Sequence, residues 1–105
     1  MGQFDHAIEE LRAGREAEVR PRGSSMRPKI ESGALVRLAP VAPELLRKGD
    51  VVLVRVRSRI YLHLVSALDR ERVQISNNHG HVNGWAPRSA VYGRAVAIDN
   101  ARGRR

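Results

Sequence analysis

Hydrophobic side chains near the start of the chain recur with the spacing of an α-helix. Phe4, Ala7, Ile8 and Leu11 occupy positions i, i+3, i+4 and i+7, which lie on one face of a helix. Gly14 follows as a natural stop, because glycine readily adopts the left-handed backbone conformation found at helix ends. The pattern predicts a short amphipathic helix.

From Ala17 onward the hydrophobic spacing changes to two, the repeat of a β-strand. Ala17 and Val19 alternate with polar neighbours, and later stretches with strand composition are bounded by proline, glycine or polar residues. These stretches are residues 34–38, 51–57, 60–66, 73–76 and 91–98. Short strands separated by tight turns predict a mainly β fold, in the form of a small mixed antiparallel β domain.

The segment before the last of these strands has a different composition. Residues 77–84 are polar and are expected to form a loop, in which Asn83-Gly84 makes a turn. Trp85 is most simply an aromatic side chain that covers the core.

The length of 105 residues suits one domain with a packed interior. We expect an N-terminal helix over residues 1–14, a β domain over 15–98 and a basic, disordered tail over 99–105. No apolar run is long enough to span a membrane, and the first ten residues lack the apolar block of a secretory signal. These observations predict a soluble, cytoplasmic protein.

Composition narrows the chemistry that the chain can perform. The absence of cysteine excludes a thiolate nucleophile, a disulfide framework and cysteine metal sites, so serine is the first candidate for covalent catalysis. The net charge is +8, and 17 of the 19 basic residues are arginine, which permits binding to nucleic acid or acidic proteins. The aromatic residues show no RNA-binding spacing, so a solvated basic surface is the favoured interpretation.

The hexapeptide Gly23-Ser24-Ser25-Met26-Arg27-Pro28 lies where a strand gives way to a turn. A serine hydroxyl becomes a nucleophile when a base takes its proton and backbone N–H groups stabilise the oxyanion, and a constrained turn can supply both exposure and donors. Taken alone, the hexapeptide is more typical of an ordinary Gly-Ser turn.

Further motifs follow this hexapeptide in a recognisable order. Ser25-Met26-x-Pro28 precedes Gly33 and an apolar strand, and Gly49-Asp50 then begins a hairpin. In the order and spacing of these pieces, over roughly residues 19–98, the chain resembles the type I signal peptidase and LexA-like group of serine peptidases. The resemblance implies a β domain of the LexA C-terminal and signal peptidase catalytic type.

The resemblance also implies roles for individual residues. The base of that group lies on the second arm of the hairpin, where this chain has His63, whereas Lys29 and Lys48 fall in turns and fit poorly. Histidine-using relatives carry an aspartate that orients the imidazole, and Asn77 stands nearest to that position here. An asparagine carbonyl can hold an imidazole N–H but stabilises the imidazolium less than a carboxylate does.

These inferences predict a serine endopeptidase with Ser25 as nucleophile, His63 as general base and Asn77 as orienting residue. The backbone around Ser24 and Ser25 is expected to bind the oxyanion, with Met26 beside it in substrate binding.

No cofactor or metal is expected, because His79 and His81 lack a clear third ligand. The expected partner is a peptide or protein substrate. The alternative is a non-catalytic β module, either a pseudopeptidase or a basic domain that binds nucleic acid or protein. Neither the natural substrate nor the oligomeric state can be read from the sequence.

Overall fold

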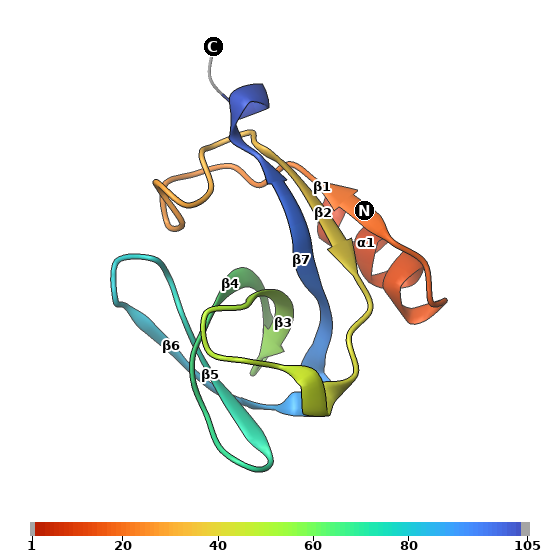
Figure 1. The fold of residues 1–105 in the computed structure, drawn as a ribbon, viewed down its shortest axis with the longest axis vertical. Helices are drawn as coiled ribbons and strands as arrows, with labels where there is room; N and C mark the ends of the chain where they lie inside the picture. The colour runs from red at the N-terminus through yellow and green to blue at the C-terminus, as the bar shows by residue number, and fades with distance from the viewer. Residues whose placement is uncertain (1, 104–105) are drawn as a thin grey trace.

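A computed structural model describes residues 2–103 and contains one α-helix and seven strands (Figure 1). The helix is α1 (Gln3–Arg12), and the strands are β1 (Ala17–Val19), β2 (Leu35–Ala39), β3 (Val51–Val56), β4 (Arg59–Leu68), β5 (Arg72–Ser76), β6 (Val82–Pro87) and β7 (Val91–Asp99). Short 3₁₀ helices span Pro43–Leu45, Arg88–Ala90 and Asn100–Gly103. The predictions of a mainly β fold and a short N-terminal helix are confirmed.

The seven strands form one curled, half-barrel sheet in the order β1-β2-β7-β3-β4-β5-β6, and every neighbouring pair is antiparallel. The C-terminal strand β7 inserts between β2 and β3, so the last strand of the chain joins its first half to its second (Figure 1). No helix in the described part of the chain is long and apolar enough to cross a lipid bilayer.

Strand β3 is buried on both faces and separates two hydrophobic cores. Val51 and Leu53 belong to the core beneath α1, whereas Val52, Val54 and Val56 belong to the core enclosed by the second half of the sheet. Successive side chains of a strand point to opposite faces, so an uninterrupted apolar run is the pattern expected of a central strand covered on both sides.

Helix α1 packs closely against the sheet at a glycine. A Cβ atom on Gly93 of β7 would lie 2.8 Å from the Ala39 carbonyl oxygen and 2.9 Å from Leu11 Cδ2 of the helix. The three helix residues Ala7, Ile8 and Leu11 are buried in the same core. The position of α1 relative to the sheet is therefore fixed by close packing.

A β-bulge at Gly49 sets the hydrogen-bonding direction of β4. The Gly49 N–H donates to the Val65 carbonyl oxygen, and the Val65 N–H donates to the Asp50 carbonyl oxygen, both at 2.8 Å. Gly49 has a φ of +96°, as the first residue of such a bulge requires. Asp50 accepts the Arg47 N–H through Oδ2 at 2.8 Å and so caps this turn.

The segment predicted as a loop and turn contains an additional strand. Gly84 lies within β6 opposite Ile75, and the tight turn occurs earlier, around Gly80. Trp85 does not cover the core, because its side chain is 40% exposed and the Arg72 guanidinium lies 4.8 Å above its ring. Ala86 fills the core position instead, since alternate residues of a strand face opposite ways.

The segment expected to be a disordered tail begins with ordered structure. Asp99 is the last residue of β7, and a 3₁₀ helix follows it. The Asn100 side chain donates to the Lys29 carbonyl oxygen and accepts the Glu31 N–H. These contacts join the end of the sheet to the β1–β2 loop, while Arg104 and Arg105 lie outside the described residues.

Candidate active site

Ser25 is exposed in the loop between β1 and β2. Gly23, two residues before it, has a φ of +106°, a conformation that L side chains rarely adopt. Tight turns follow, in which the Arg27 N–H donates to the Ser24 carbonyl oxygen and the Ile30 N–H donates to the Met26 carbonyl oxygen. The loop thus presents the serine hydroxyl on a constrained backbone.

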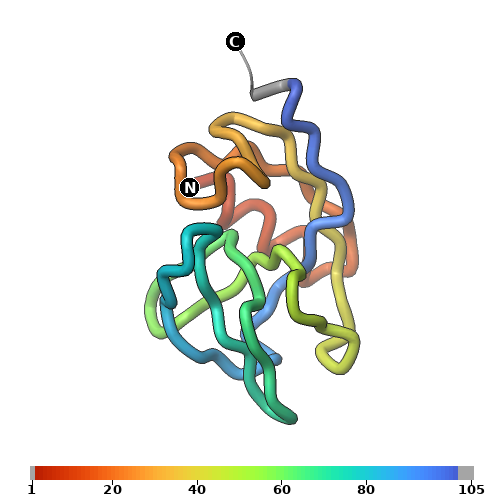
Figure 2. The backbone as a smooth tube through the Cα atoms, turned by 60° about the vertical axis from the view of Figure 1, so that its left-hand side comes forward, coloured from red at the N-terminus to blue at the C-terminus, as the bar shows by residue number. Residues whose placement is uncertain are grey.

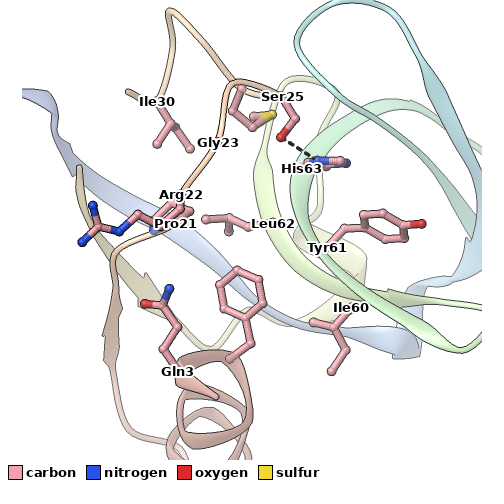
Figure 3. A pocket seen from close by; sticks show the side chains of 12 residues that line it. Gln3, Pro21, Arg22, Gly23, Ser25, Ile30, Ile60, Tyr61, Leu62 and His63 are labelled. Atoms are coloured by element: carbon pink, nitrogen blue, oxygen red, sulfur yellow. Dashed lines mark hydrogen bonds between the residues drawn. The ribbon is translucent and has the colours of Figure 1, made fainter. Parts of the chain in front are cut away.

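His63 faces this hydroxyl from β4. Its Nε2 atom lies 3.2 Å from Ser25 Oγ, within hydrogen-bond distance (Figure 3). The histidine is buried, with 9% of its surface exposed, and the ring centroid of Tyr61 lies 5.0 Å from its own. The sequence predicted that these two residues would meet, although they are 38 positions apart.

Asn83 of β6 contacts the other side of the imidazole. Asn83 Oδ1 lies 2.7 Å from His63 Nδ1, and because an amide oxygen can only accept, Nδ1 carries the proton in this bond. A neutral imidazole with a proton on Nδ1 has a bare Nε2, which is the atom that faces Ser25. Asn83 therefore selects the tautomer in which His63 can accept the serine proton.

Asn77, predicted to hold the imidazole, has a different place and partners. Its side-chain oxygen accepts the backbone N–H groups of His79 and His81, each at 2.9 Å, and its own N–H donates to the His81 carbonyl oxygen. Asn77 thus shapes the turn between β5 and β6. The orienting contact belongs to Asn83, which the sequence prediction assigned only to a turn.

The β5–β6 turn also holds the loop that carries Ser25. The Asn78 N–H donates to the Ser25 carbonyl oxygen at 2.8 Å, and Asn78 Nδ2 donates to the Arg27 carbonyl oxygen at 3.0 Å. His79 Nε2 donates to the Ser24 carbonyl oxygen at 2.8 Å. Figure 2 shows this turn lying beside the β1–β2 loop. Three hydrogen bonds therefore fix the loop that carries Ser25 to the hairpin that supplies Asn83.

Burial lowers the pKa of His63 below its usual 6.5, because charging the ring within the protein loses hydration. The hydrogen bond to Asn83 opposes this effect, and the positive potential of His81 adds to it. The net direction favours the neutral imidazole at neutral pH. A neutral histidine is the form that can act as a general base.

The predicted oxyanion-binding residues surround Ser25. The backbone N–H groups of Ser24, Ser25 and Met26 donate no hydrogen bond to any described residue, so they are available to a ligand. The Ser24 carbonyl oxygen, in contrast, is occupied by Arg27 and His79. The Met26 side chain is buried and forms part of a pocket wall. Its role in substrate binding stays a prediction.

A pocket of about 270 Å³ opens between the β1–β2 loop and β4 (Figure 3). Ser25 and His63 lie at one end of it, and its walls combine apolar and polar groups. The lining residues are Gln3, Phe4, Pro21, Arg22, Gly23, Ser25, Met26, Ile30, Ile60, Tyr61, Leu62 and His63. A cleft in which polar groups converge among apolar side chains is typical of a ligand site.

The edge of β4 that faces this pocket has no neighbouring strand. Strand β5 pairs with β4 only from Leu64 onward, so residues 60–63 are paired on the β3 side alone. In an antiparallel strand, the N–H and C=O groups of successive residues point alternately to the two neighbouring sides. Those of Val65 bond toward β3, so those of Leu62 and Ile60 point away from β3. Their N–H and C=O groups point to the open edge.

The opposite wall of the pocket presents a second set of backbone groups. The Pro21 carbonyl oxygen accepts the Gly33 N–H, and the Gly23 N–H donates to Ser32 Oγ, so both residues bond to the segment just before β2. The backbone groups of Arg22, between them, face the other way, because the C=O and N–H of a trans peptide point to opposite sides, and they bond to no described residue. The pocket thus lies between the open edge of β4 and the segment that follows β1.

Other candidate chemistry is not assembled in the described residues. Lys29 and Lys48 are exposed, and His63, not a lysine, lies at Ser25. Within residues 2–103 no three histidine or acidic side chains are grouped so that they could hold a metal ion. The Nε2 atom of His79 donates its hydrogen bond to the Ser24 carbonyl oxygen.

Comparison of the chain with protein-family models, curated proteins and solved structures finds no match.

Proposed function

We propose that the protein is a serine peptidase in which Ser25 is the nucleophile, His63 the general base and Asn83 the residue that orients it. The observation that carries the proposal is the chain of contacts from Asn83 Oδ1 to His63 Nδ1 and from His63 Nε2 to Ser25 Oγ, at 2.7 and 3.2 Å. A nucleophile, a base and an orienting group in this order are the arrangement that activates a serine hydroxyl.

In the proposed reaction, His63 Nε2 takes the proton from Ser25 Oγ as Oγ attacks the peptide carbonyl carbon. The carbonyl electron pair moves onto oxygen, where N–H groups of the Ser24–Met26 backbone stabilise the negative charge. The intermediate collapses, and the C–N bond breaks as the leaving amine takes the proton from His63. Water, deprotonated by His63, then releases the acyl group and restores Ser25.

The open edge of β4 and the Arg22 backbone that faces the pocket support a peptide substrate. An extended peptide placed between them can bond to Arg22 on one side and to Leu62 and Ile60 on the other. Main-chain hydrogen bonds of this kind bind many sequences, while the limited pocket volume favours small apolar side chains near the cut. This mode agrees with the resemblance to the signal peptidase and LexA-like group, whose fold type is part of the proposal.

The amide at Asn83 favours a second candidate function. A carboxylate would stabilise the imidazolium that forms during acylation, and an amide oxygen carries no full charge with which to do so. The same groove could then bind a peptide without cleaving it, as a pseudopeptidase. Peptide binding that is unchanged in Ser25→Ala, together with no turnover in the parent, would favour this second function.

Cleavage of a peptide library by the parent, Ser25→Ala and His63→Ala proteins tests the peptidase proposal. Ser58→Ala is the matched control, because Ser58 is an exposed serine in the β3–β4 turn, outside the pocket. We expect cleavage by the parent and by Ser58→Ala, and none above background by the other two. Equal cleavage by all four proteins would refute the proposal.

A further inference from the structure

Gln3 of α1 occupies the backbone groups of Arg20, just before the pocket. Its Nε2 atom donates to the Arg20 carbonyl oxygen at 2.8 Å, and its Oε1 atom accepts the Arg20 N–H at 2.6 Å. This two-point contact has the donor and acceptor pattern of a paired β-strand residue. The side chain of Gln3 therefore takes the place that an added strand would otherwise fill.

The contact lies on the same backbone edge that faces the pocket at Arg22. Pro21 and Gly23 bond to Gly33 and Ser32, just before β2, so the N–H and C=O groups of Arg22 turn the other way. Those of Arg20 turn toward Gln3. Gln3 covers the groups of Arg20 and leaves those of Arg22 uncovered. A peptide that pairs at Arg22 cannot continue its pairing at Arg20.

Phe4, the residue after Gln3 in α1, also lines the pocket. Gln3 and Ile60 lie at the end of the pocket away from Ser25, with α1 beneath it (Figure 3). Phe4 is half-buried and packs against the core that holds α1 to the sheet. Because close packing at Gly93 fixes this helix, the barrier is part of the folded domain.

We propose that α1 makes the groove blind at this end, so that the enzyme cuts only near one end of a peptide chain. The inference rests on the proposed peptidase function. Residues 60–63 give about 10 Å of open strand edge, which is enough for about three or four extended residues between Ser25 and α1. The substrate class is therefore peptides whose chain end lies within about four residues of the cut.

Two series of peptides with one shared cut sequence test this inference. One series is lengthened on the N-terminal side of the cut and the other on the C-terminal side, from two to about eight residues. We expect kcat/KM to fall about tenfold beyond four residues in one series only, because the longer chain must leave the groove and lose backbone hydrogen bonds. Little dependence on length is expected in the other series.

Opening the blind end should remove this length dependence. We expect the double variant Gln3→Ala, Phe4→Ala to cut long and short peptides at similar rates. Gln3→Ala alone, which changes an exposed residue, should reduce the difference between the two rates. Glu9→Ala, an exposed residue of α1 outside the pocket, is the control and should keep the parental preference. A parent that cuts long and short peptides equally in both series would overturn the blind groove while leaving the peptidase function intact.

Measurements of peptide binding distinguish failure of the blind-groove inference from failure of the proposed peptidase function. Affinities of the same peptides for Ser25→Ala should show the same one-sided dependence on length. If the parent has no Ser25-dependent cleavage, the peptidase proposal fails, and these affinities alone decide the inference. Equal affinity for short and long peptides, or no binding of either, would overturn it.

Discussion

His63 Nδ1 lies 2.7 Å from Asn83 Oδ1, on the side of the ring opposite Ser25. The contact joins the middle of β4 to β6, and strand β5 lies between these two strands in the sheet. It fixes the tautomer of the histidine without adding a negative charge. The proposed activity depends on this relationship, and its consequences can be measured.

Replacing Asn83 with aspartate should increase peptidase activity. A carboxylate raises the pKa of His63 and stabilises the imidazolium that forms as Ser25 attacks, so we expect kcat/KM to rise by about tenfold at neutral pH. Asn83→Ala loses the orienting contact and should lower kcat/KM by at least about tenfold. Steady-state kinetics of the two variants check this, and a rate unchanged in both would exclude a role for Asn83.

The pH dependence of cleavage should report the lowered pKa of His63. The protonated ring cannot accept the Ser25 proton, so kcat/KM rises with pH as His63 loses its own proton. Because burial lowers this pKa, the midpoint of the rise should lie below 6.5. In Asn83→Asp the midpoint should move to higher pH, since the added negative charge favours the imidazolium. A parental midpoint above 6.5 would contradict the assignment.

Stability should also depend on His63 below neutral pH. The unfolded chain binds a proton at His63 near pH 6.5, whereas the folded protein binds it only at lower pH. The free energy of unfolding is therefore unaffected by this group above pH 6.5 and decreases as pH falls from 6.5 through the lower folded pKa. Denaturant titrations of the parent and His63→Gln, from neutral pH to about pH 5, should show a smaller decrease in the variant. Parallel curves would contradict the prediction.

The hydrogen bonds between the β5–β6 turn and the nucleophile loop should affect turnover more than binding. Asn78→Ala removes the bond to Arg27, and His79→Ala removes the bond to Ser24, which leaves Ser25 less well fixed. We expect each change to lower kcat by about tenfold with little change in KM, because the chemical step requires close positioning of the reacting atoms. Ser58→Ala serves as the control, since Ser58 is exposed and lies outside the pocket. An effect confined to KM would contradict a positioning role.

Gly93→Ala should destabilise the fold through α1. The new Cβ atom would lie 2.8 Å from the Ala39 carbonyl oxygen and 2.9 Å from Leu11, so helix and sheet must move apart. Overpacking of this kind costs about 1–3 kcal/mol of unfolding free energy. Gly2→Ala is the control, because its Cβ would meet only Asp5 Oδ2 at 3.7 Å. Equal stability of the two variants in denaturant titrations would contradict the described packing.

The sequence predicted most strands, because period-two patterns and tight turns are local signals. The meeting of Ser25 with His63, 38 positions apart, was expected only from the resemblance to the peptidase group. It missed β6, since Asn83-Gly84 has the composition of a turn, and only pairing with β5 makes the segment a strand. The orienting residue was missed for the same reason. Asn77 is close to the expected position along the chain, but the β5–β6 turn moves it away and returns Asn83 to the histidine. Val82 and Trp85, residue types that are common in strands, flank Asn83-Gly84 and were the signal that could have indicated this strand.

The blind end of the groove was not predicted either. Phe4 was recognised as part of an amphipathic helix, but no pattern in the sequence places that helix beside β4. The contact of Gln3 with Arg20 spans 17 positions and depends on how α1 packs against the sheet. Long-range placement of this kind follows from the close packing at Gly93 rather than from local preference.

Covalent labelling of Ser25 tests the central claim most directly. A fluorophosphonate reacts with a serine whose hydroxyl is activated by a base, and mass spectrometry of the digested protein locates the adduct. The account predicts one adduct on Ser25, absent in His63→Ala, unchanged in Ser58→Ala and formed faster in Asn83→Asp. An unlabelled Ser25, or labelling that is as fast without His63, would contradict it.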